Sequence, residues 1–215
     1  RYERQLDLPS SNEKWFAWSI FLPKDYESLN FANTVLGQLK DCCNRKPPII
    51  VSLLERENTL RFSYDISENQ RWCMPTDTGI EDLDTIKGKW TDIMIMVSTD
   101  HVYQENKSYS KVFINGNKVC DVPNPVIDRS NHELQFTYGI YNSFISRWFD
   151  ENKTTNVEST RWLDQHEGFV IGSTTNKPYD IDWGVKLPTH IVYFDEMRFG
   201  PSRESVDINM NEPVD

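Results

Sequence analysis

Residues 110–119 read SKVFINGNKV and carry the clearest structural signal in the chain. Asn115-Gly116 stands between two short apolar runs, and this dipeptide favours the tight turn of a β-hairpin. Further runs alternate polar and apolar residues or are rich in aromatic and β-branched residues, which is typical of strands. These runs are residues 15–22, 49–54, 59–64, 91–98, 133–141 and 190–200. At least eight short strands at this spacing predict an all-β fold, a β-jelly-roll sandwich of two antiparallel sheets.

Helical patterning is weak, and only residues 30–39 show a spacing that predicts one or two helical turns. The length of 215 residues fits a single domain, residues 1–215. Residues 146–189 form a long polar stretch between two predicted strands. A connection longer than about 15 residues usually has a function or a structure of its own. We therefore interpret this stretch as an insertion or lid, and we expect an irregular tail after Gly200.

The charge of the chain bears on its partners. The net charge is −10, from 23 basic and 33 acidic residues. Nucleic-acid binding draws most of its affinity from basic groups that neutralise phosphates, so this balance argues against a nucleic-acid partner. The longest apolar runs, such as residues 93–97, are far shorter than the ~20 residues that cross a bilayer. We expect no membrane insertion, and the sequence does not indicate an oligomeric state.

The cysteines and the start of the chain bear on the compartment. Cys42, Cys43, Cys73 and Cys120 contain no C-x-x-C pair, which gives a zinc site or a thioredoxin-like site little support. One long-range disulfide, two, or none remain open alternatives. The chain opens RYER without Met or an apolar segment. We interpret it as a processed chain whose signal peptide has been removed, and expect a secreted or extracellular protein.

Three segments carry candidate site residues. RYERQL at 1–6 places Arg1, Glu3 and Gln5 on one face of an extended segment, because strand side chains alternate. VLGQLKD at 35–41 would place Gln38 and Lys40 on one face. FTYGIYN at 136–142 has two tyrosines around a glycine. Taken singly, the three have ordinary alternatives, namely a solvated edge strand, a surface glutamine and packing tyrosines.

The order of the motifs along the chain resembles the β-jelly-roll polysaccharide lyases, the group of heparin lyase I, glucuronan lyase and the jelly-roll alginate lyases. The resemblance implies a concanavalin A-like jelly roll and covers most of residues 1–200. The motifs that carry it are Arg1-Tyr2-Glu3, residues 15–23, Leu36-Gly37-Gln38, Gly88-Lys89-Trp90-Thr91-Asp92, residues 112–116, Gly139-Ile140-Tyr141 and residues 192–200.

The resemblance implies β-elimination on an anionic polysaccharide that contains uronic acids. In such enzymes a glutamine, arginine or histidine binds the uronate carboxylate and stabilises the charge that develops at C5. A tyrosine then removes the C5 proton and returns a proton to the leaving oxygen. By motif, Tyr141 corresponds to that tyrosine and Gln38 to the carboxylate-binding glutamine. The residues expected to contact substrate are Arg1, Glu3, Arg4, Lys40, Tyr138, Asn142 and His132.

Three positions depart from the pattern. Alginate lyases typically read Q-x-H where this chain has Lys40, and a lysine cannot act as a neutral imidazole base. Thr137 stands in place of a lysine, and Gln5 in place of an arginine. A second hypothesis is therefore a non-catalytic carbohydrate-binding or adhesion domain, of a virion or a cell surface, that retains the fold. We expect no required cofactor and no catalytic metal, and a structural calcium ion held by oxygen ligands remains open.

The insertion at residues 146–189 contains three tryptophans, Trp148, Trp162 and Trp183. We expect the segment to fold over one end of the cleft, with the tryptophans stacking on sugar rings. The alternative is that they anchor the loop by burying large apolar surface.

Overall fold

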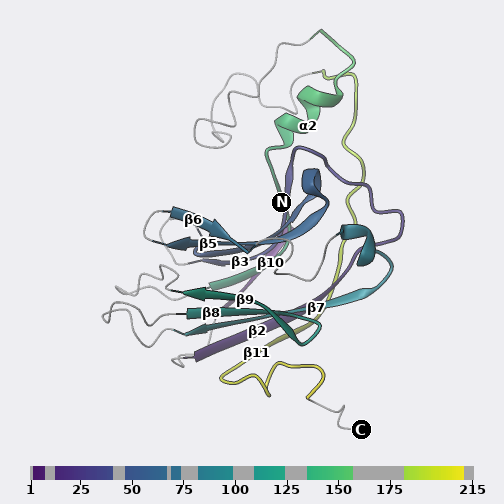
Figure 1. The fold of residues 1–215 in the computed structure, drawn as a ribbon. Helices are drawn as coiled ribbons and strands as arrows, with labels where there is room; N and C mark the ends of the chain where they lie inside the picture. The colour runs from purple at the N-terminus through teal and green to yellow at the C-terminus, as the bar shows by residue number, and fades with distance from the viewer. Residues whose placement is uncertain are drawn as a thin grey trace.

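The computed structural model describes residues 2–7, 13–40, 47–66, 69–73, 82–98, 109–123, 135–156 and 182–210. For residues 2–7, 65–66, 69–70, 109, 122–123 and 146 it describes the backbone alone. These residues form two antiparallel sheets that lie face to face (Figure 1). The predicted all-β jelly-roll class is confirmed. His132, Arg1, Trp162 and the pair Cys42 and Cys43 lie outside the described residues.

One sheet has six strands and the other has five. In spatial order, the six-stranded sheet contains β1 (Tyr2–Asp7), β10 (Gln135–Ser143), β3 (Asn33–Lys40), β4 (Ile49–Leu54), β5 (Thr59–Ile66) and β6 (Asn69–Trp72). The five-stranded sheet contains β11 (Tyr193–Gly200), β2 (Glu13–Phe21), β7 (Trp90–Ser98), β8 (Tyr109–Ile114) and β9 (Asn117–Pro123). The helical elements described are η1 (Glu55–Glu57), η2 (Leu83–Thr85) and α2 (Ile145–Asn152).

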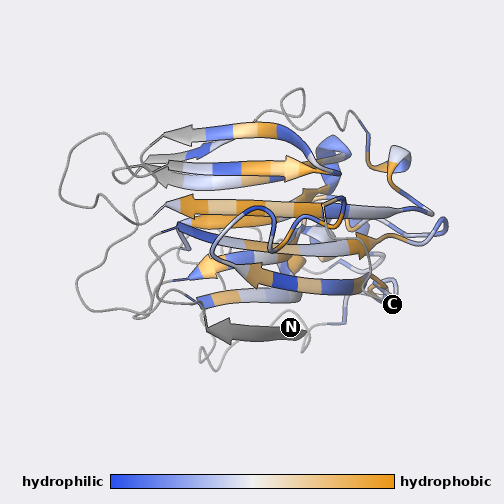
Figure 2. Ribbon diagram, turned by 90° about the horizontal axis from the view of Figure 1, so that it is seen from below, coloured by the Kyte–Doolittle hydropathy of each residue, from blue (hydrophilic) through white to orange (hydrophobic). Residues whose placement is uncertain are grey.

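The core lies between the sheets and is rich in aromatic side chains. Phe16 and Trp18 of β2 meet Phe136 of β10, with ring centroids 4.6 and 4.9 Å apart. Several strands carry both hydrophilic and hydrophobic residues along their length (Figure 2), as expected when one face packs on the core, whereas β2 and β7 are buried along most of theirs. Burying each large apolar side chain contributes about 1.5–3 kcal/mol. A Cβ at Gly37 would lie 2.9 Å from the Trp18 ring, so this glycine packs directly against the aromatic cluster.

The hairpin predicted at Asn115-Gly116 is confirmed. It joins β8 to β9, and both turn residues have positive φ, 49° and 79°. Such backbone angles match the twist of paired strands and are least strained for Asn and Gly. The Asn115 side chain also accepts a hydrogen bond from the Asp92 backbone N–H, at 2.9 Å. The turn is thus tied to the neighbouring strand β7.

The helical turns predicted in residues 30–39 are wrong, since β3 occupies most of that segment. The cause is a β-bulge at Leu36, where the pairing with β4 skips a residue between Val35 and Gly37. An extra residue interrupts the alternation of a strand. As a result Val35, Leu36 and Leu39 are all buried, at a spacing that imitates the period of a helix.

The tail after Gly200 is irregular, as expected, but residues 201–210 pack on the outer face of the five-stranded sheet. Val206 is fully buried there against β2, β7 and β8. The Arg203 guanidinium lies 4.8 Å from the centre of the Phe113 ring and donates to the Gly116 carbonyl at 3.0 Å. This part of the outer face is therefore occupied by the chain itself.

A disulfide joins the two sheets. Cys73 follows β6 in the six-stranded sheet, and Cys120 lies in β9 of the five-stranded sheet, with Cα atoms 6.1 Å apart. Both residues are buried in the core. The bond therefore links the edge of one sheet to the edge of the other.

Loss of this disulfide should destabilise the fold. Because the bond closes a loop with a sequence separation of 47 residues, replacing both cysteines by alanine should lower the free energy of unfolding by about 2–4 kcal/mol. Urea unfolding followed by circular dichroism measures the change. The single variants Cys73→Ala and Cys120→Ala should match the double variant, since each breaks the same bond. Single effects that add to give the double effect would contradict the assignment.

The insertion begins with α2, and residues 157–181 lie outside the described part of the chain. Trp183 is 2% exposed and stacks on Phe149 of α2, with ring centroids 5.4 Å apart. Trp148 meets the same phenylalanine edge-on. Burial of Trp183 fits an anchor better than a sugar-stacking surface. The lid itself stays a prediction.

No helix among the described residues is long and apolar enough to cross a membrane.

Candidate active site

Two cross-strand rows of side chains lie on the outer face of the six-stranded sheet. Side chains in register on neighbouring antiparallel strands share a face. The first row joins Tyr141 of β10, Val35 of β3, Ser52 of β4 and Arg61 of β5. Their neighbours in sequence, such as Leu53 and Phe62, point into the core. The first row therefore faces away from the other sheet.

The second row runs parallel to the first. It joins Thr137 of β10, Gln38 of β3, Ile50 of β4, Ser63 of β5 and Trp72 of β6. Rows on one face of a regular strand are two residues apart, about 7 Å. The glutamine predicted to bind a carboxylate thus shares a face with the tyrosine predicted to move the proton.

Two irregularities place these side chains. The bulge at Leu36 lets Val35 and Gln38, three residues apart, share the outer face. A second register shift lies in β10 between Tyr138 and Tyr141. Within it Gly139 has φ 128°, a backbone angle that other residues rarely adopt. The glycine of the G-I-Y motif is thus required by the backbone that presents Tyr141.

The structure places Tyr141, Gln38 and Lys40 on the same outer face of the six-stranded sheet. Gln38 is 4% exposed, and its backbone carbonyl accepts a hydrogen bond from the Thr137 hydroxyl at 3.4 Å. Lys40 is half-buried and in register with Gln135, two residues beyond Gln38 on the same face. A half-buried tyrosine, a buried amide and a cation therefore share the outer face of β10 and β3, in successive rows along the strands.

Tyr138 and Asn142 lie on the opposite face of β10. The Tyr138 ring packs between the sheets, 6.3 Å from Phe136 and 6.2 Å from Phe194 between ring centroids. Asn142 is in register with Thr34, which is buried on the core side. The structure therefore separates both residues from Tyr141, and their role in substrate binding stays a prediction that this geometry does not favour.

The backbone pairing of β1 with β10 fixes the positions of the candidate residues in the first strand. Glu3 pairs with Gly139 and Arg4 pairs with Tyr138. The position of Glu3 is therefore next to the bulge that presents Tyr141, while the position of Arg4 is opposite a core tyrosine. The expected contacts of Arg1 and His132 concern residues outside the described part of the chain.

Two motifs of the resemblance have structural roles on the other sheet. Asp92 of β7 forms an ion pair with Arg198 of β11 and accepts a hydrogen bond from the Ser19 hydroxyl at 3.1 Å. Burial raises the pKa of Asp92, while Arg198 and Ser19 act in the opposite direction. Asp195-Glu196 lies at a register shift where Glu196 has φ 53°. The Asp92–Arg198 ion pair ties the edge strand β11 to β7 across β2.

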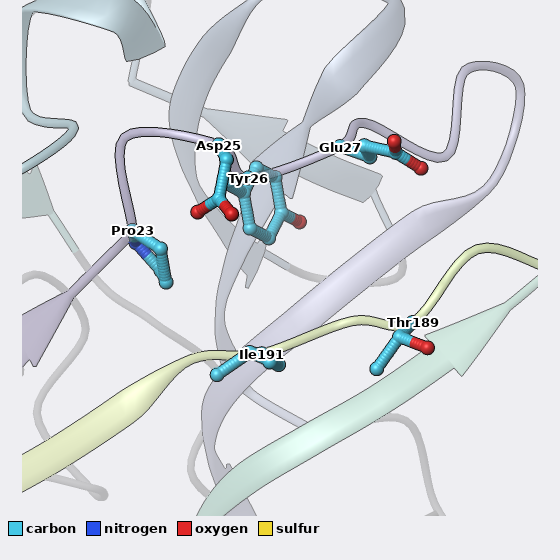
Figure 3. Close-up of a pocket in the computed structure, with 6 residues that line it drawn as sticks. All are labelled: Pro23, Asp25, Tyr26, Glu27, Thr189 and Ile191. Atoms are coloured by element: carbon cyan, nitrogen blue, oxygen red, sulfur yellow. The ribbon is translucent and has the colours of Figure 1, made fainter.

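A pocket of about 290 Å³ lies elsewhere, between the segment that follows β2 and the segment that precedes β11 (Figure 3). Its lining residues are Pro23, Asp25, Tyr26, Glu27, Thr189 and Ile191.

The Tyr26 hydroxyl donates to the buried Glu55 carboxylate at 2.8 Å. Glu55 also accepts hydrogen bonds from Ser28, Thr34 and the Leu29 backbone. A carboxylate surrounded by donors in this way suits a structural role rather than a cation or a catalytic proton.

His190 packs beside this carboxylate and should make stability depend on pH. Its Nε2 donates to the Glu27 carbonyl at 2.9 Å and lies 3.9 Å from a Glu55 oxygen, while its Nδ1 is buried without a partner among the described residues. Burial lowers the pKa of His190, against the opposing effect of Glu55. The unfolded chain, with an ordinary histidine pKa of about 6.5, therefore takes up the proton first as the pH falls. The stability that His190 contributes is present above that value and is lost below it.

The measurement is urea unfolding at about pH 7 and about pH 5, on either side of the ordinary histidine pKa. We expect the wild-type protein to lose more free energy of unfolding on acidification than the His190→Gln variant, which keeps a donor for the Glu27 carbonyl. An equal loss in the two proteins would contradict the buried neutral histidine.

No group of three or more His, Cys, Asp or Glu side chains in the described part of the chain is arranged to hold a metal ion. The open alternative of a structural calcium ion therefore has no candidate site among these residues, and it stays an untested expectation.

Sequence reasoning did not single out Arg61, Ser52 and Trp72, which share the outer face with Tyr141 and Gln38. The signal was the alternation in residues 59–64, where polar positions predict a solvated face. In the structure Ser52 and Ser63 are buried on that face, and Trp72 is 51% exposed. Their shared face with Tyr141 becomes visible only from the pairing of the five strands β10, β3, β4, β5 and β6.

Two stacked sheets, with a tyrosine and a glutamine on the outer face of the larger one, define a jelly-roll protein with a polar site on one sheet. Residues 2–198 match the family described as Polysaccharide lyase. The chain belongs to this family. Family membership implies that a polysaccharide is the substrate.

Two solved structures share the fold at low sequence identity, and a third shows a weaker similarity over part of the chain. The endo-β-1,4-glucuronan lyase from the fungus Trichoderma reesei is 15% identical, with a TM-score of 0.54 over 96% of this chain and 77% of that chain. A sialidase is 11% identical, with a TM-score of 0.50 over 95% of this chain and 14% of that chain. An alginate lyase of polysaccharide lyase family 7 is 18% identical, with a TM-score of 0.38 over 60% of this chain and 47% of that chain. No curated protein matches the sequence.

Proposed function

We propose that the protein cleaves a uronic-acid-containing polysaccharide by β-elimination, with Tyr141 and Gln38 as its catalytic residues. The observation that carries the proposal is that these two side chains lie on one face of the six-stranded sheet, on the adjacent strands β10 and β3. Membership of the polysaccharide lyase family supports it. The Trichoderma reesei protein with the same fold is a glucuronan lyase.

The chemistry assigns a separate task to each side chain. The Gln38 amide donates hydrogen bonds to the uronate carboxylate, which lowers the cost of the negative charge that spreads from C5 as its proton leaves. Tyr141, acting as its phenolate, takes the C5 proton and becomes the phenol. The electron pair forms the C4–C5 double bond, the bond from C4 to the glycosidic oxygen breaks, and that oxygen leaves with a proton returned by the tyrosine. Lys40 adds positive charge near the carboxylate.

A panel of uronic-acid polymers tests the proposal. Glucuronan, alginate and heparin-like chains are incubated with the protein, and the ultraviolet absorbance of the unsaturated sugar end is followed. We expect the absorbance to rise on at least one polymer. Equal absorbance with and without protein on every polymer, with binding retained, would favour the second candidate.

The second candidate is a non-catalytic carbohydrate-binding or adhesion domain on the same fold. The observation that favours it is Lys40, which occupies the position where alginate lyases typically have a histidine. A lysine retains the attraction for an anionic chain but not the neutral imidazole. Retention of Gln38 and Tyr141 on one face favours the lyase, because binding alone has no special need for that pair. Either function suits a secreted or extracellular protein.

A further inference from the structure

Arg61 is a half-buried cation on the outer face that the chemistry above does not use. Its Nε is buried and has no hydrogen-bond partner among the described residues. Burial lowers the pKa of Arg61, and nearby Glu57 acts in the opposite direction, yet an arginine keeps its charge in proteins. Burying a charge is costly unless a partner and hydrogen bonds compensate it. The guanidinium is therefore suited to receive an anion.

Ser52 supplies a second polar group beside it. The two residues are in register on β4 and β5. Ser52 is 1% exposed, and its hydroxyl has no partner among the residues that the structure describes. A hydroxyl and a guanidinium on one face can both donate to the same carboxylate. The outer face therefore holds two unsatisfied hydrogen-bond donors side by side, on the adjacent strands β4 and β5.

Their position relative to Tyr141 suggests what the anion belongs to. Tyr141, Val35, Ser52 and Arg61 form one row. Adjacent strands are about 4.8 Å apart, so the backbones at the two ends of the row are about 14 Å apart. The long side chains of Tyr141 and Arg61 stand at the two ends of the row, and the shorter, buried Val35 and Ser52 lie between them. In the second row, Trp72 of β6 offers an exposed aromatic ring beyond Arg61.

We propose that Arg61 and Ser52 bind the carboxylate of a uronate next to the sugar that reacts at Tyr141, so that the polymer crosses the strands from β10 towards β6. This second uronate subsite rests on the proposed function. The subsite recognises charge on a non-reacting sugar. Arg61 is therefore a binding residue that sets the preference for a polymer with adjacent uronates.

Arg61→Gln tests the subsite by kinetics. Loss of hydrogen bonds to a charged group should raise KM for glucuronan or alginate about 10–100-fold, with kcat changed less than KM because the reacting sugar is untouched. The matched control is Arg71→Gln, an exposed arginine of β6 in register with the core-side Tyr64, which should leave KM unchanged. Arg61→Lys, which keeps the charge, should recover part of the loss. An unchanged KM in folded Arg61→Gln, or in folded Arg61→Lys if the glutamine variant does not fold, would overturn the subsite.

Binding without turnover separates this subsite from the proposed function. Calorimetry with Tyr141→Phe protein compares each polymer with its carboxyl-reduced, neutral form. We expect Arg61→Gln in this background to weaken binding of the charged polymer and to leave binding of the neutral form unchanged. If wild-type protein shows no elimination but this difference persists, the subsite stands and the lyase proposal fails. If elimination occurs and Arg61→Gln binds the charged polymer as tightly as its parent, the lyase proposal stands and the subsite is wrong.

Discussion

Replacing Tyr141 with phenylalanine should lower the rate of β-elimination by about 10²–10⁴-fold, the usual loss when a general acid–base group is removed. The change deletes one hydroxyl and keeps the ring on the half-buried face of β10. Folding stability should therefore move by only about 1 kcal/mol, the net value of a typical hydrogen bond. The initial rate of absorbance increase measures the first effect, and urea unfolding measures the second.

Tyr138→Phe is the matched control, because it removes the same hydroxyl three residues away on the core face of the same strand. We expect its elimination rate to stay close to that of the wild type. Undiminished activity in Tyr141→Phe would place the proton transfer on another group. Lys40, on the same face, and His132 would then be the next residues to replace.

The fold could be predicted where local sequence and tertiary structure agree. Asn115-Gly116 makes its turn through its own backbone preferences, and β2 is recognisable because aromatic residues follow one another up to Pro23. The segment of β3 could not be predicted, because the bulge at Leu36 is imposed by pairing with β4. That pairing joins segments whose register the local pattern does not contain.

The site could be predicted only in part, because strand pairing also decides which side chains share its face. Motif order pointed to Tyr141 and Gln38, and the structure places them on one face. Motif order assigned the proton transfer to Tyr141 but placed Tyr138 in the same site as a substrate contact. The register shift between the two tyrosines, which depends on how β10 pairs with β3, could not be read from the local sequence. Arg61 was missed because a polar position in an alternating strand is typical of a solvated face, whereas its burial depends on neighbours in other strands.

Replacing Gln38 should have the second large effect on turnover. Removal of one donor to a developing negative charge costs about 10²–10³-fold in rate, by comparison with oxyanion-hole donors. Gln38 is buried, so alanine would also leave a small void. Gln38→Glu keeps the shape and turns the amide into a carboxylate that repels the uronate. Its loss of activity should be at least as large as that of Gln38→Ala, although it leaves no void.

The double variant Gln38→Ala/Tyr141→Phe decides whether the two residues serve one step. Groups that act on a single transition state are strongly non-additive, so the double variant should be little slower than Tyr141→Phe alone. Initial rates of absorbance increase on one polymer at saturating concentration give the comparison. Losses that multiply would mean that Gln38 acts on binding or folding rather than on the charge that Tyr141 creates. A Gln38→Glu protein as active as the wild type would remove the glutamine from the site, because a buried carboxylate beside a uronate carboxylate must oppose its binding.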